Sequence, residues 1–577
     1  MYKGTTPRIR KVLYALIAAF ALLAVRLIFV QMGAAKPLSN IASNQYRLAV
    51  SLLPKRGIIY DRNRKELAIT INLTSVFAEP FKVKDKEFAS QKLASVLGAS
   101  RQDIYKKLSQ EKGFAWLARK VSPDIARAVN ALNIKGIDFI KEPQRVYPNG
   151  VMASHVLGFT DTDNNGLEGL ELRFDKHLKG IQGYRYAIRD AKQREVPSYE
   201  YKEIQPADGD NVVLTIDNMI QSIAEKELEK GYKKFHAKGA CIIVMDPFTG
   251  DILALANRPS YDPNNAKGWP ADSRRNRAIC DYFEPGSSFK IIAASSLLEE
   301  KAVRSDEKFY CENGEYRWFG HTYHDHTPRG WLAFRDVIKY SSNIGTMKAA
   351  QKLGPDRLYK YIKKFGFGEK TGIELPGEIN GVTTHPSTWS KLSLCSISMG
   401  QEVTVTALQL SRAMAVLANG GNLVAPRIVE SIEDRTGHVI KKFETKKPQR
   451  IISEETAKEM RDILRGVVDS GTAELAEVDG YFPAGKTGTA QKVESNGTYS
   501  HSKFTASFIG FVPYDNPRLV IAVIMDEPRP FYYGGVVCTP VFKKVTAELM
   551  SYYKIWPKEA EKRIKITEKS EIKKNHR

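Results

Sequence analysis

The segment EPGSSFKIIAASSLLEE places a serine and a lysine at a spacing that could activate a nucleophile. Ser287 and Lys290 are three residues apart at the start of an apolar run that follows a Pro-Gly turn. Residues three apart on a helix share a face and residues two apart do not, so Ser287 rather than Ser288 faces Lys290. The free N–H groups and the positive dipole end of a helix N-terminus favour a neutral lysine and can hold an oxyanion. A neutral Lys290 could then take the proton of Ser287 and make its oxygen nucleophilic.

The serine-lysine spacing carries little information by itself, because it recurs at several other places in the chain. The other copies are Ser109/Lys112, Ser305/Lys308, Ser500/Lys503, Ser551/Lys554 and Ser570/Lys573. Only Ser287 and Lys290 follow a Pro-Gly turn and open an apolar run. A catalytic role for this serine therefore requires further polar segments that reach the same cleft.

Two later segments have the composition that such a cleft requires. KYSSNIGT, with Ser-Ser-Asn at residues 341–343, is predicted to form a short polar loop. AGKTGTAQ, with Lys-Thr-Gly-Thr at residues 486–489, is predicted to lie on a strand, where Gly488 would let a substrate backbone lie against the strand edge. A second Lys-Thr-Gly, at residues 370–372, lies in a turn-rich segment that no long strand pair follows. We therefore reject that copy.

Near the N-terminus, KVLYALIAAFALLAVRLIFVQ gives a nearly continuous apolar stretch over residues 12–30. As a helix this stretch would span roughly 28 Å, close to the thickness of one bilayer core. Basic residues cluster before the stretch, whereas Lys36 is the nearest one after it. The positive-inside rule then predicts a transmembrane anchor over residues 12–31, with residues 1–11 in the cytoplasm and the rest of the chain outside. A cleaved signal peptide is the alternative, with residues 33–35 as a poor cleavage site.

The chain has 577 residues, of which 42% are hydrophobic and 26% charged, so it is long enough for more than one folded domain. Its formal net charge of +22 suits an anionic partner such as a membrane surface or cell-wall material. We expect no nucleic-acid partner, because no zinc-finger spacing and no RNA-binding aromatic signature occur. The five cysteines are scattered without a CxxC pair, which argues against a disulfide framework.

Blocks of predicted strands and helices indicate a mixed α+β chain with an antiparallel sheet. The predicted strands form a turn-rich pair, a single strand, a hairpin and two long strands joined at an Asp-Asn-Pro turn, over residues 54–68, 211–217, 239–261 and 505–528. Short amphipathic helices are predicted over residues 85–145, and turns with a short helix over 145–178. A longer helix is predicted over residues 218–235, with Asp217 or Asn218 as its cap.

The three polar motifs, in this order, resemble those of penicillin-binding proteins and serine β-lactamases. The chain as a whole resembles the class B penicillin-binding proteins, the membrane-anchored transpeptidases of bacterial cell-wall synthesis, and in particular their division-type (septal) branch. The matching segments are RGIIYDRN, HVLGFTDTDNNGLEGLE, VMDPFTGDILALANRPSYDPN, EPGSSFK, SSNIGTMKAA, FGFGEKTGIELPGE, GQEVTVTALQL, AGKTGTAQK and SFIGFVPYDNPRLVIAVIMDEP.

This resemblance implies a reaction and a role for each motif residue. Ser287 would attack the penultimate D-Ala carbonyl of a peptidoglycan stem peptide, release D-Ala and form an acyl-enzyme. Lys290 would be the base for acylation. Ser341 and Asn343 would relay protons and orient Lys290 and the substrate, and Lys486 would keep the cleft positive.

The resemblance also implies how the substrate is bound. Thr487 and Thr489, on either side of Gly488, would bind the terminal carboxylate of the stem peptide. The backbone N–H groups of Ser287 and Thr489 would form the oxyanion hole. A side-chain amine of a neighbouring peptidoglycan strand would then attack the acyl-enzyme and close the cross-link, and β-lactam antibiotics would acylate the same serine. No cofactor and no metal are implied.

The implied architecture is a single transmembrane helix, an elongated pedestal (dimerisation) domain over residues 36–205 and a transpeptidase domain over residues 206–555. The last would have the serine β-lactamase-like fold, an antiparallel sheet flanked by helices, and a basic tail over residues 556–577 would follow it. The catalytic domain would lie on the outer side of a bacterial cytoplasmic (inner) membrane. The implied partners are a polytopic glycosyltransferase of the SEDS family and other divisome membrane proteins. The PKRG and GLEGLE segments would be structural or partner-facing.

Three further segments could be mistaken for ligand sites. FGHTYHDHTPRGWLAF holds His321, His324, Asp325 and His326, but adjacent turn residues often point apart, so we expect a position at the cleft edge rather than a zinc site. DTDNNGLEG lacks the register of a calcium loop and is predicted to be a turn. FYYGG, at residues 531–535, is predicted to be a mobile loop beside the cleft.

Other functions on the same fold stay open at this point. They are an elongation-type transpeptidase, a D,D-carboxypeptidase, a β-lactamase and a scaffold without catalytic activity. A hydrolase needs a positioned water and a base for deacylation, and no residue of the sequence can be assigned to that task.

Overall fold

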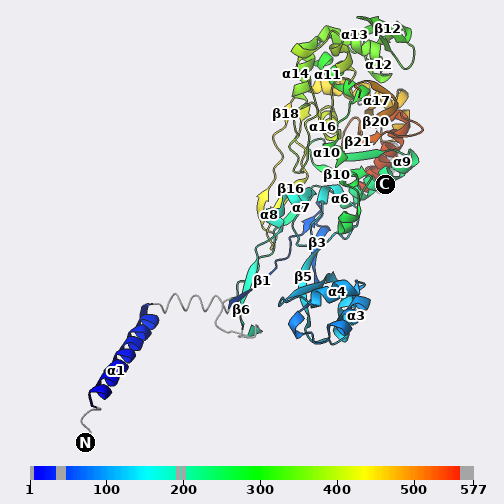
Figure 1. The fold of residues 1–577 in the computed structure, drawn as a ribbon. Coiled ribbons are helices and arrows are strands. Elements are labelled where there is room, and N and C mark those ends of the chain that lie inside the picture. The colour runs from blue at the N-terminus through cyan, green and yellow to red at the C-terminus, as the bar shows by residue number, and fades with distance from the viewer. Residues whose placement is uncertain (1–5, 34–46, 190–194, 197–202, 495, 559–577) are drawn as a thin grey trace, which may run out of the picture. The chain divides into compact units, whose positions relative to one another are not determined.

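The computed structural model describes residues 6–33, 47–189, 195–196, 203–494 and 496–558 (Figure 1). The chain divides into two units, each built from several stretches. The first unit consists of Met1–Lys55, Asn72–Pro143 and Gly180–Ala207, and the second of Arg56–Ile71, Gln144–Lys179 and Asp208–Arg577. Most of the predicted tail over residues 556–577 lies outside the described residues, as do the first five residues.

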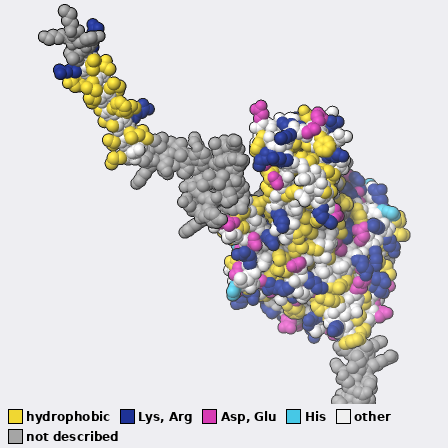
Figure 2. Space-filling model, turned by 90° about the horizontal axis from the view of Figure 1, so that it is seen from below, with side chains coloured by type: hydrophobic (Ala, Val, Ile, Leu, Met, Phe, Trp, Pro, Cys, Tyr) yellow, Lys and Arg dark blue, Asp and Glu magenta, His cyan; other side chains and the backbone are white. Residues whose placement is uncertain are grey.

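The N-terminal helix α1 (Thr6–Ile28) continues into a π-helical turn, η1 (Phe29–Gly33). Within the described ranges, Pro7–Met32 is the one segment long and apolar enough to cross a membrane, and none of it is buried by protein. Hydrophobic side chains cover this helix along its length (Figure 2). A long apolar helix that no protein core covers fits a single-pass membrane anchor.

The rest of the first unit contains a small sheet and a small α+β core. The sheet consists of the antiparallel strands β1 (Arg47–Leu52), β6 (Gly183–Arg189) and β7 (Glu195–Val196). The core is formed by α3 (Lys86–Leu97), α4 (Arg101–Leu108), α5 (Pro123–Ala131), β4 (Ala115–Val121) and parts of β3 (Glu66–Ala78) and β5 (Ile137–Val146). The predicted short helices are confirmed. The prediction of helices throughout 85–145 is wrong for β4 and β5, because both strands are selected by pairing with the distant β3.

The second unit is built on a five-stranded antiparallel sheet with the strand order β10-β9-β21-β20-β19. Its strands are β9 (Gly239–Met245), β10 (Ile252–Arg258), β19 (Ala484–Val493), β20 (Tyr499–Val512) and β21 (Leu519–Asp526). The predicted hairpin and the predicted pair of long strands are both confirmed. This order leaves β19, which carries the Lys-Thr-Gly-Thr motif, at one edge of the sheet.

Two helices cover one face of this sheet, α9 (Asn218–Lys234) and α19 (Thr539–Tyr552). On this face Phe508 of β20 packs edge-to-face against Phe542 of α19, with ring centroids 4.7 Å apart. Asp217 caps α9, because its carboxylate accepts hydrogen bonds from two backbone N–H groups of the first turn, at 2.9 and 3.2 Å. The structure therefore decides between the two predicted caps in favour of Asp217.

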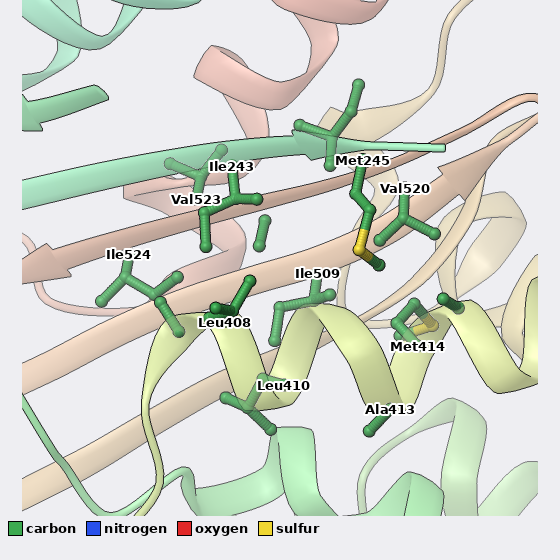
Figure 3. Close-up of a cluster of buried hydrophobic side chains, with 14 of the residues drawn as sticks. Ile243, Met245, Leu408, Leu410, Ala413, Met414, Ile509, Val520, Val523 and Ile524 are labelled. Carbon is green, nitrogen blue, oxygen red and sulfur yellow. The ribbon is translucent and has the colours of Figure 1, made fainter. Parts of the chain in front are cut away.

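The opposite face is covered by α16 (Ala407–Ala418). Leu408 and Met414 of this helix lie beside Ile243 and Ile509 of the sheet (Figure 3). Lys486 is the direct partner of Ile509 in the ladder between β19 and β20. Directly paired residues of neighbouring strands point to the same face of a sheet, so Lys486 also lies on the face that α16 covers. With helices on both sides, the central strands are buried on both faces, which explains their unbroken apolar sequences.

A group of helices lies beyond this face and includes the helix that begins at Lys290 (Figure 1). The group consists of α11 (Lys290–Glu299), α12 (Phe334–Lys339), α13 (Asn343–Leu353), α14 (Pro355–Lys364), α15 (Ser393–Ser398) and α17 (Glu454–Ser470). Every residue of α11 from Lys290 to Leu298 is buried, which makes it a central helix.

Short elements complete the second unit. A second sheet contains β2 (Ile59–Tyr60), β8 (Asn211–Leu214), β16 (Val429–Glu433), β17 (Val439–Lys442) and the first part of β3. The other short elements are α6 (Ser154–Leu157), α7 (Gly169–Arg173), α8 (Asp175–Leu178), α10 (Arg277–Cys280), α18 (Gly534–Val537), β11 (Lys308–Tyr310), β12 (Glu315–Trp318), β13 (His321–His324), β14 (Trp331–Ala333), β15 (Asn422–Leu423) and β18 (Gln449–Arg450). The predicted mixed α+β organisation is thus confirmed.

A buried charge cluster joins the PKRG and GLEGLE segments within the second unit. Glu171 is fully buried and pairs with Arg56 and with Arg145, whose Nε lies 2.6 Å from Glu171 Oε1. Arg56 also donates to Asp175 at 2.6 Å. These residues therefore hold chain segments together, as expected for structural motifs.

We expect Glu171→Gln to destabilise the protein strongly, because it leaves two buried guanidinium groups without their shared carboxylate. Removal of one partner of a buried ion pair costs about 3–5 kcal/mol. The free energy of unfolding, measured by urea titration, should fall by that amount. Glu455→Gln, at an exposed position of α17, is the control and should change it by less than about 1 kcal/mol. Equal losses in the two variants would contradict a structural role for the cluster.

Candidate active site

The candidate nucleophile, Ser287, lies on a short 3₁₀ turn, η5 (Gly286–Phe289), that leads directly into α11. Side chains at i and i+3 eclipse each other in a 3₁₀ helix, so Ser287 and Lys290 project from the same side of this turn. Ser287 is half-buried, whereas Ser288 is fully buried and donates its hydroxyl hydrogen to the Pro285 oxygen at 2.7 Å. Of the two serines, Ser287 is the one that a substrate can reach.

Gly286 lets this turn approach strand β19. Its φ angle of +53° lies in the left-handed region, and a Cβ atom there would lie only 2.8 Å from the backbone oxygen of Thr489. A side chain at this position would therefore be strained and would also push the turn away from the strand. The Pro-Gly pair thus brings the serine next to the Lys-Thr-Gly-Thr motif.

Lys290 is fully buried, and its side-chain nitrogen is held by the polar loop at residues 341–343. Its Nζ donates to the backbone oxygen of Ser341 at 2.6 Å, to Ser341 Oγ at 3.2 Å and to Asn343 Oδ1 at 2.8 Å. Its hydrogen bonds within the described residues do not include one to Ser287. The loop thus orients Lys290, and the hydroxyl of Ser287 is left for another partner.

Lys486 of strand β19 reaches the hydroxyl of Ser341. Its Nζ is fully buried and donates to Ser341 Oγ at 3.0 Å and to the backbone oxygen of Thr487 at 3.3 Å. Ser341 has a φ angle of +61°, which is unusual for a residue with a side chain and places its hydroxyl between the two lysines. Three segments that are far apart in the sequence therefore meet at one oxygen atom.

The surroundings of the two lysines favour a neutral amine. Burial lowers the pKa of Lys290 to about 7, although the nearby Asp325 carboxylate opposes the shift. Burial and the charge of Lys290 hold the pKa of Lys486 well below its usual range. Two ammonium groups around one hydroxyl in a dry site would repel each other, so the site favours a neutral amine on one of the two lysines. Such an amine can accept a proton from a nearby hydroxyl.

Strand β19 offers the backbone edge that an extended peptide could join. In the described residues β19 pairs only with β20, so its other edge has no strand partner. Thr487 Oγ1 lies 2.9 Å from Thr472 Oγ1, and Thr489 Oγ1 accepts a hydrogen bond from the Gly534 N–H at 3.0 Å. Two hydroxyls on one strand can therefore be presented to a carboxylate beside Ser287.

The packing around position 488 leaves room only for a glycine. A Cβ atom at this position would lie 2.4 Å from Ser507 Oγ and 2.6 Å from the Pro285 oxygen. The sequence suggested that this glycine admits a substrate. In the structure, this glycine is required by the contact between β19 and the turn that carries Ser287.

Asp325 holds the polar loop, a role that the sequence did not reveal. Its carboxylate accepts from Ser342 Oγ at 2.5 Å and from the backbone N–H groups of Asn343 and Ile344 at 2.5 and 3.1 Å. Asn343 in turn donates to the His324 oxygen at 2.9 Å. Only the position of this segment at the cleft edge was expected. The sequence feature that could have indicated this role of Asp325 is an acidic residue shortly before a loop that leads into a helix.

We expect Asp325→Asn to slow acylation by a penicillin about 10- to 100-fold, because a charge-assisted hydrogen bond contributes about 1.5–3 kcal/mol. The Asp325 charge raises the pKa of Lys290, so its removal should also move the rise of the acylation rate to lower pH. Stopped-flow acylation between pH 5 and 9 measures both effects. Asp306→Asn, on the surface, is the control. A slower rate with an unchanged pH midpoint would indicate a purely structural effect.

Three other features of the sequence were considered as possible sites: the second Lys-Thr-Gly copy, the histidine-rich segment and the cysteines. Residues 370–372 lie in an irregular segment, where Thr371 donates to Glu378 at 2.5 Å. His321 and His324 lie in the β12–β13 hairpin, and the described residues hold no group of three His, Cys, Asp or Glu side chains that could bind a metal. The described cysteines are all free.

Aromatic rings from the 531–535 segment lie beside the motif strand. Tyr532 stacks on Phe504 with ring centroids 4.1 Å apart, and Tyr533 contacts the His326 ring at 5.0 Å. Since Gly534 bonds to Thr489, this segment lies next to the motif strand, as the sequence predicted. Its predicted mobility stays a prediction.

The family assignment follows from comparison with known proteins. The family described as "Penicillin binding protein transpeptidase domain" matches residues 240–547, and the family "Penicillin-binding Protein dimerisation domain" matches residues 51–214. The chain belongs to the class B penicillin-binding proteins. The boundaries expected at residues 36–205 and 206–555 stay predictions.

Relatives of this class B chain extend over nearly all of it. Stage V sporulation protein D of Bacillus subtilis is 34% identical over 94% of this chain and 85% of its own length. Peptidoglycan D,D-transpeptidase FtsI of Escherichia coli is 32% identical, over 87% of this chain and 84% of its own. The crystal structure of penicillin-binding protein 3 from Mycobacterium tuberculosis, complexed with aztreonam, superimposes with a TM-score of 0.70 at 29% identity, over 88% of this chain and 98% of that one.

Proposed function

We propose that this protein is a septal peptidoglycan D,D-transpeptidase that cross-links stem peptides through a serine acyl-enzyme and is inhibited covalently by β-lactams. The observation that supports this most directly is the meeting of Lys290 and Lys486 at the Ser341 hydroxyl, beside a half-buried serine at a sheet edge. The relatives named D,D-transpeptidases and the aztreonam complex of a similar structure support the same reaction.

In the first half of the reaction, Ser287 Oγ attacks the carbonyl carbon of the penultimate D-Ala. Its proton passes to the neutral amine of Lys290. The bond to the terminal D-Ala breaks, and the proton reaches the leaving amine through Lys290 and the Ser341 hydroxyl. The N–H groups of Ser287 and Thr489 hold the oxyanion. The product is an ester between the stem peptide and Ser287.

In the second half, an amine of a neighbouring strand attacks this ester. The amine loses a proton to Lys290, a peptide bond forms, and the Ser287 oxygen leaves and recovers a proton. Asn343 orients Lys290 and the substrate. When Lys290 is the neutral member of the pair, Lys486 carries the one positive charge beside the Ser341 hydroxyl and so keeps the cleft positive. Thr487 and Thr489, beside Gly488, bind the terminal carboxylate of the incoming stem peptide before acylation.

The basic residues before α1 support an orientation with the N-terminus inside the cell and the second unit on the outer side of the cytoplasmic membrane. There the enzyme meets peptidoglycan. Its membrane partners are a SEDS-family glycosyltransferase and other divisome proteins, contacted through α1 and the first unit.

The test is D-Ala release from a pentapeptide that ends in D-Ala-D-Ala, using the purified full chain with and without an amine acceptor. We expect release that depends on the acceptor and a cross-linked product in the mass spectrum. Release without acceptor, with a hydrolysed tetrapeptide, would instead identify a D,D-carboxypeptidase. A septal role further predicts that the tagged protein gathers at the division site, whereas an even distribution along the side wall would indicate an elongation enzyme.

A further inference from the structure

Two basic side chains contact one aromatic ring directly before the polar loop at residues 341–343. The central guanidinium carbon of Arg329 lies 3.7 Å from the centroid of the Tyr340 ring, and Lys339 Nζ lies 5.1 Å from the same centroid. Both distances are within the roughly 6 Å over which a cation is attracted to the face of a ring. Tyr340 therefore holds two positive charges at the position that precedes Ser341.

No carboxylate of the described residues neutralises these two cations. Arg329 and Lys339 are both half-buried, and neither side chain forms a hydrogen bond or an ion pair in the part of the chain that the structure describes. By contrast, Arg465 of the adjacent helix α17 pairs with Glu477 at 2.5 Å. A half-buried charge has lost part of its hydration, and without a partner it gains no ion pair in return. Both cations are therefore available to an anion that comes from solvent.

Lys339 lies beside a turn that reaches one of the strand hydroxyls. A Cβ atom at Gly471 would lie 2.7 Å from the backbone oxygen of Lys339, so this turn packs directly against the lysine backbone. The next residue, Thr472, places its Oγ1 2.9 Å from Thr487 Oγ1. A single turn therefore separates Lys339 from a hydroxyl that binds the terminal carboxylate in the proposed reaction.

Arg329 belongs to the segment that follows β13, and this segment also reaches the motif strand. The His326 ring lies 5.0 Å from the Tyr533 ring, and the next residue, Gly534, donates to Thr489 Oγ1 at 3.0 Å. The two cations thus meet at one ring, and the segments around them lead to both hydroxyls of β19. They lie beside the part of the cleft in which the substrate carboxylate is proposed to bind.

The strand hydroxyls can orient a carboxylate but carry no charge with which to attract it. Thr487 and Thr489 donate as neutral groups, and the two lysines of the cleft share one positive charge at Ser341. The two further cations at Tyr340 raise the positive potential beside these hydroxyls. A cleft lined by charges of one sign raises the local concentration of ligands of the opposite sign. This attraction acts before the covalent step.

We infer that Arg329 and Lys339 are specificity-determining cations, which draw the carboxylate of a stem peptide or a β-lactam to the hydroxyls of Thr487 and Thr489. The inference rests on the proposed transpeptidase function, because it assigns a task in substrate capture to residues outside the three motifs. The carboxylate keeps its charge during acylation, so these cations stabilise the bound ligand and the transition state alike. They strengthen binding and leave the rate of the covalent step unchanged.

Stopped-flow acylation of the purified full chain in an uncharged detergent tests this inference. A penicillin is used at several concentrations, so that saturation separates its dissociation constant from the rate of the covalent step. Between about 0.02 and 0.5 M salt we expect binding to weaken about tenfold, because salt screens exposed charges, and the covalent step to stay constant. The methyl ester of the same penicillin carries no carboxylate charge, and its slower reaction should not respond to salt.

Variants of the two cations separate charge from shape. Arg329→Gln combined with Lys339→Gln should weaken penicillin binding about three- to tenfold at low salt and remove about half of the salt dependence. The covalent step and the reaction of the methyl ester should stay at the wild-type rate. Arg329→Lys keeps the charge and should retain wild-type binding. Lys458→Gln, which removes an exposed charge from α17, is the matched control and should also bind as the wild type does.

Wild-type binding of penicillin by the double variant would overturn the inference and leave the proposed function standing. Equal slowing of penicillin and its methyl ester would also overturn it, because that result indicates a changed cleft shape rather than a lost charge. A loss of the same size in Lys458→Gln would assign the effect to the net charge of the chain and would likewise overturn it. Absence of covalent labelling in the wild type would count against the proposed function itself and would remove the basis of the inference.

Discussion

Ser287→Ala is expected to abolish covalent labelling by a fluorescent penicillin. The substitution removes the oxygen that we propose forms the ester. It leaves the turn intact, because the hydroxyl of Ser287 makes no hydrogen bond within the described residues. Removal of a nucleophile typically costs a factor of about 10⁶ in rate. Gel fluorescence after incubation of the full chain with the penicillin measures the result, and an unchanged melting temperature would show that the variant is folded.

The neighbouring serine provides the control for this experiment. Ser288→Ala removes a buried hydroxyl that bonds to Pro285, and it should retain the label. Ser500→Ala tests one of the other serine-lysine pairs and should also retain it. Label on Ser287→Ala would rule out this serine as the nucleophile. Absence of label on the wild type as well would point to a cleft that needs a membrane partner, and addition of the proposed SEDS-family glycosyltransferase would then test that.

Lys290→Met is expected to slow penicillin acylation by a factor of about 10²–10⁴, the usual contribution of a general base. In the wild type the rate should rise with pH around 7, because only neutral Lys290 can accept the serine proton and burial lowers its pKa to about 7. Below this value the rate should fall about tenfold per pH unit. Lys290→Met should lack this step in the profile.

The stability effect has the same sign as the effect on activity, because both decline as the pH falls, but it occurs at higher pH. The folded-state pKa of Lys290 lies below that of the unfolded chain, so the unfolded chain binds the extra proton and stability declines as pH falls from about 10 to about 7. Lys290→Met removes this proton-linked penalty, so its unfolding should depend less on pH. Lys503→Met, at another serine-lysine pair with a partly exposed lysine, is the control and should retain the wild-type rate and pH profile. A wild-type rate in Lys290→Met would exclude Lys290 as the base.

The sequence predicted the elements of the fold where local patterns are strong. A continuous run of residues with a clear pattern encodes each of four predicted features. They are the apolar segment of α1, the helix α9 with a cap at its start, the β9–β10 hairpin and the pair β20–β21. The strands β4 and β5 were missed, because their conformation depends on pairing with β3 rather than on their own composition.

The motif residues could also be named from the sequence, since Ser287, Lys290 and the two later motifs stand in recognisable surroundings. Asp325 could not be assigned a role, because a carboxylate in a histidine-rich turn gives no local sign that it accepts from Ser342 and Asn343.

What the sequence determined by itself is therefore the chemistry available to this protein: a serine before a central apolar helix, two lysines, a polar loop, a strand motif and a membrane anchor. What only the tertiary structure decided is how these groups act on one another. Hydrogen bonds at about 3 Å, the φ angle of Ser341 and the burial that lowers the pKa of Lys290 arise when distant segments pack together. Interactions of this range depend on folded geometry, and a linear sequence records only which residues are present.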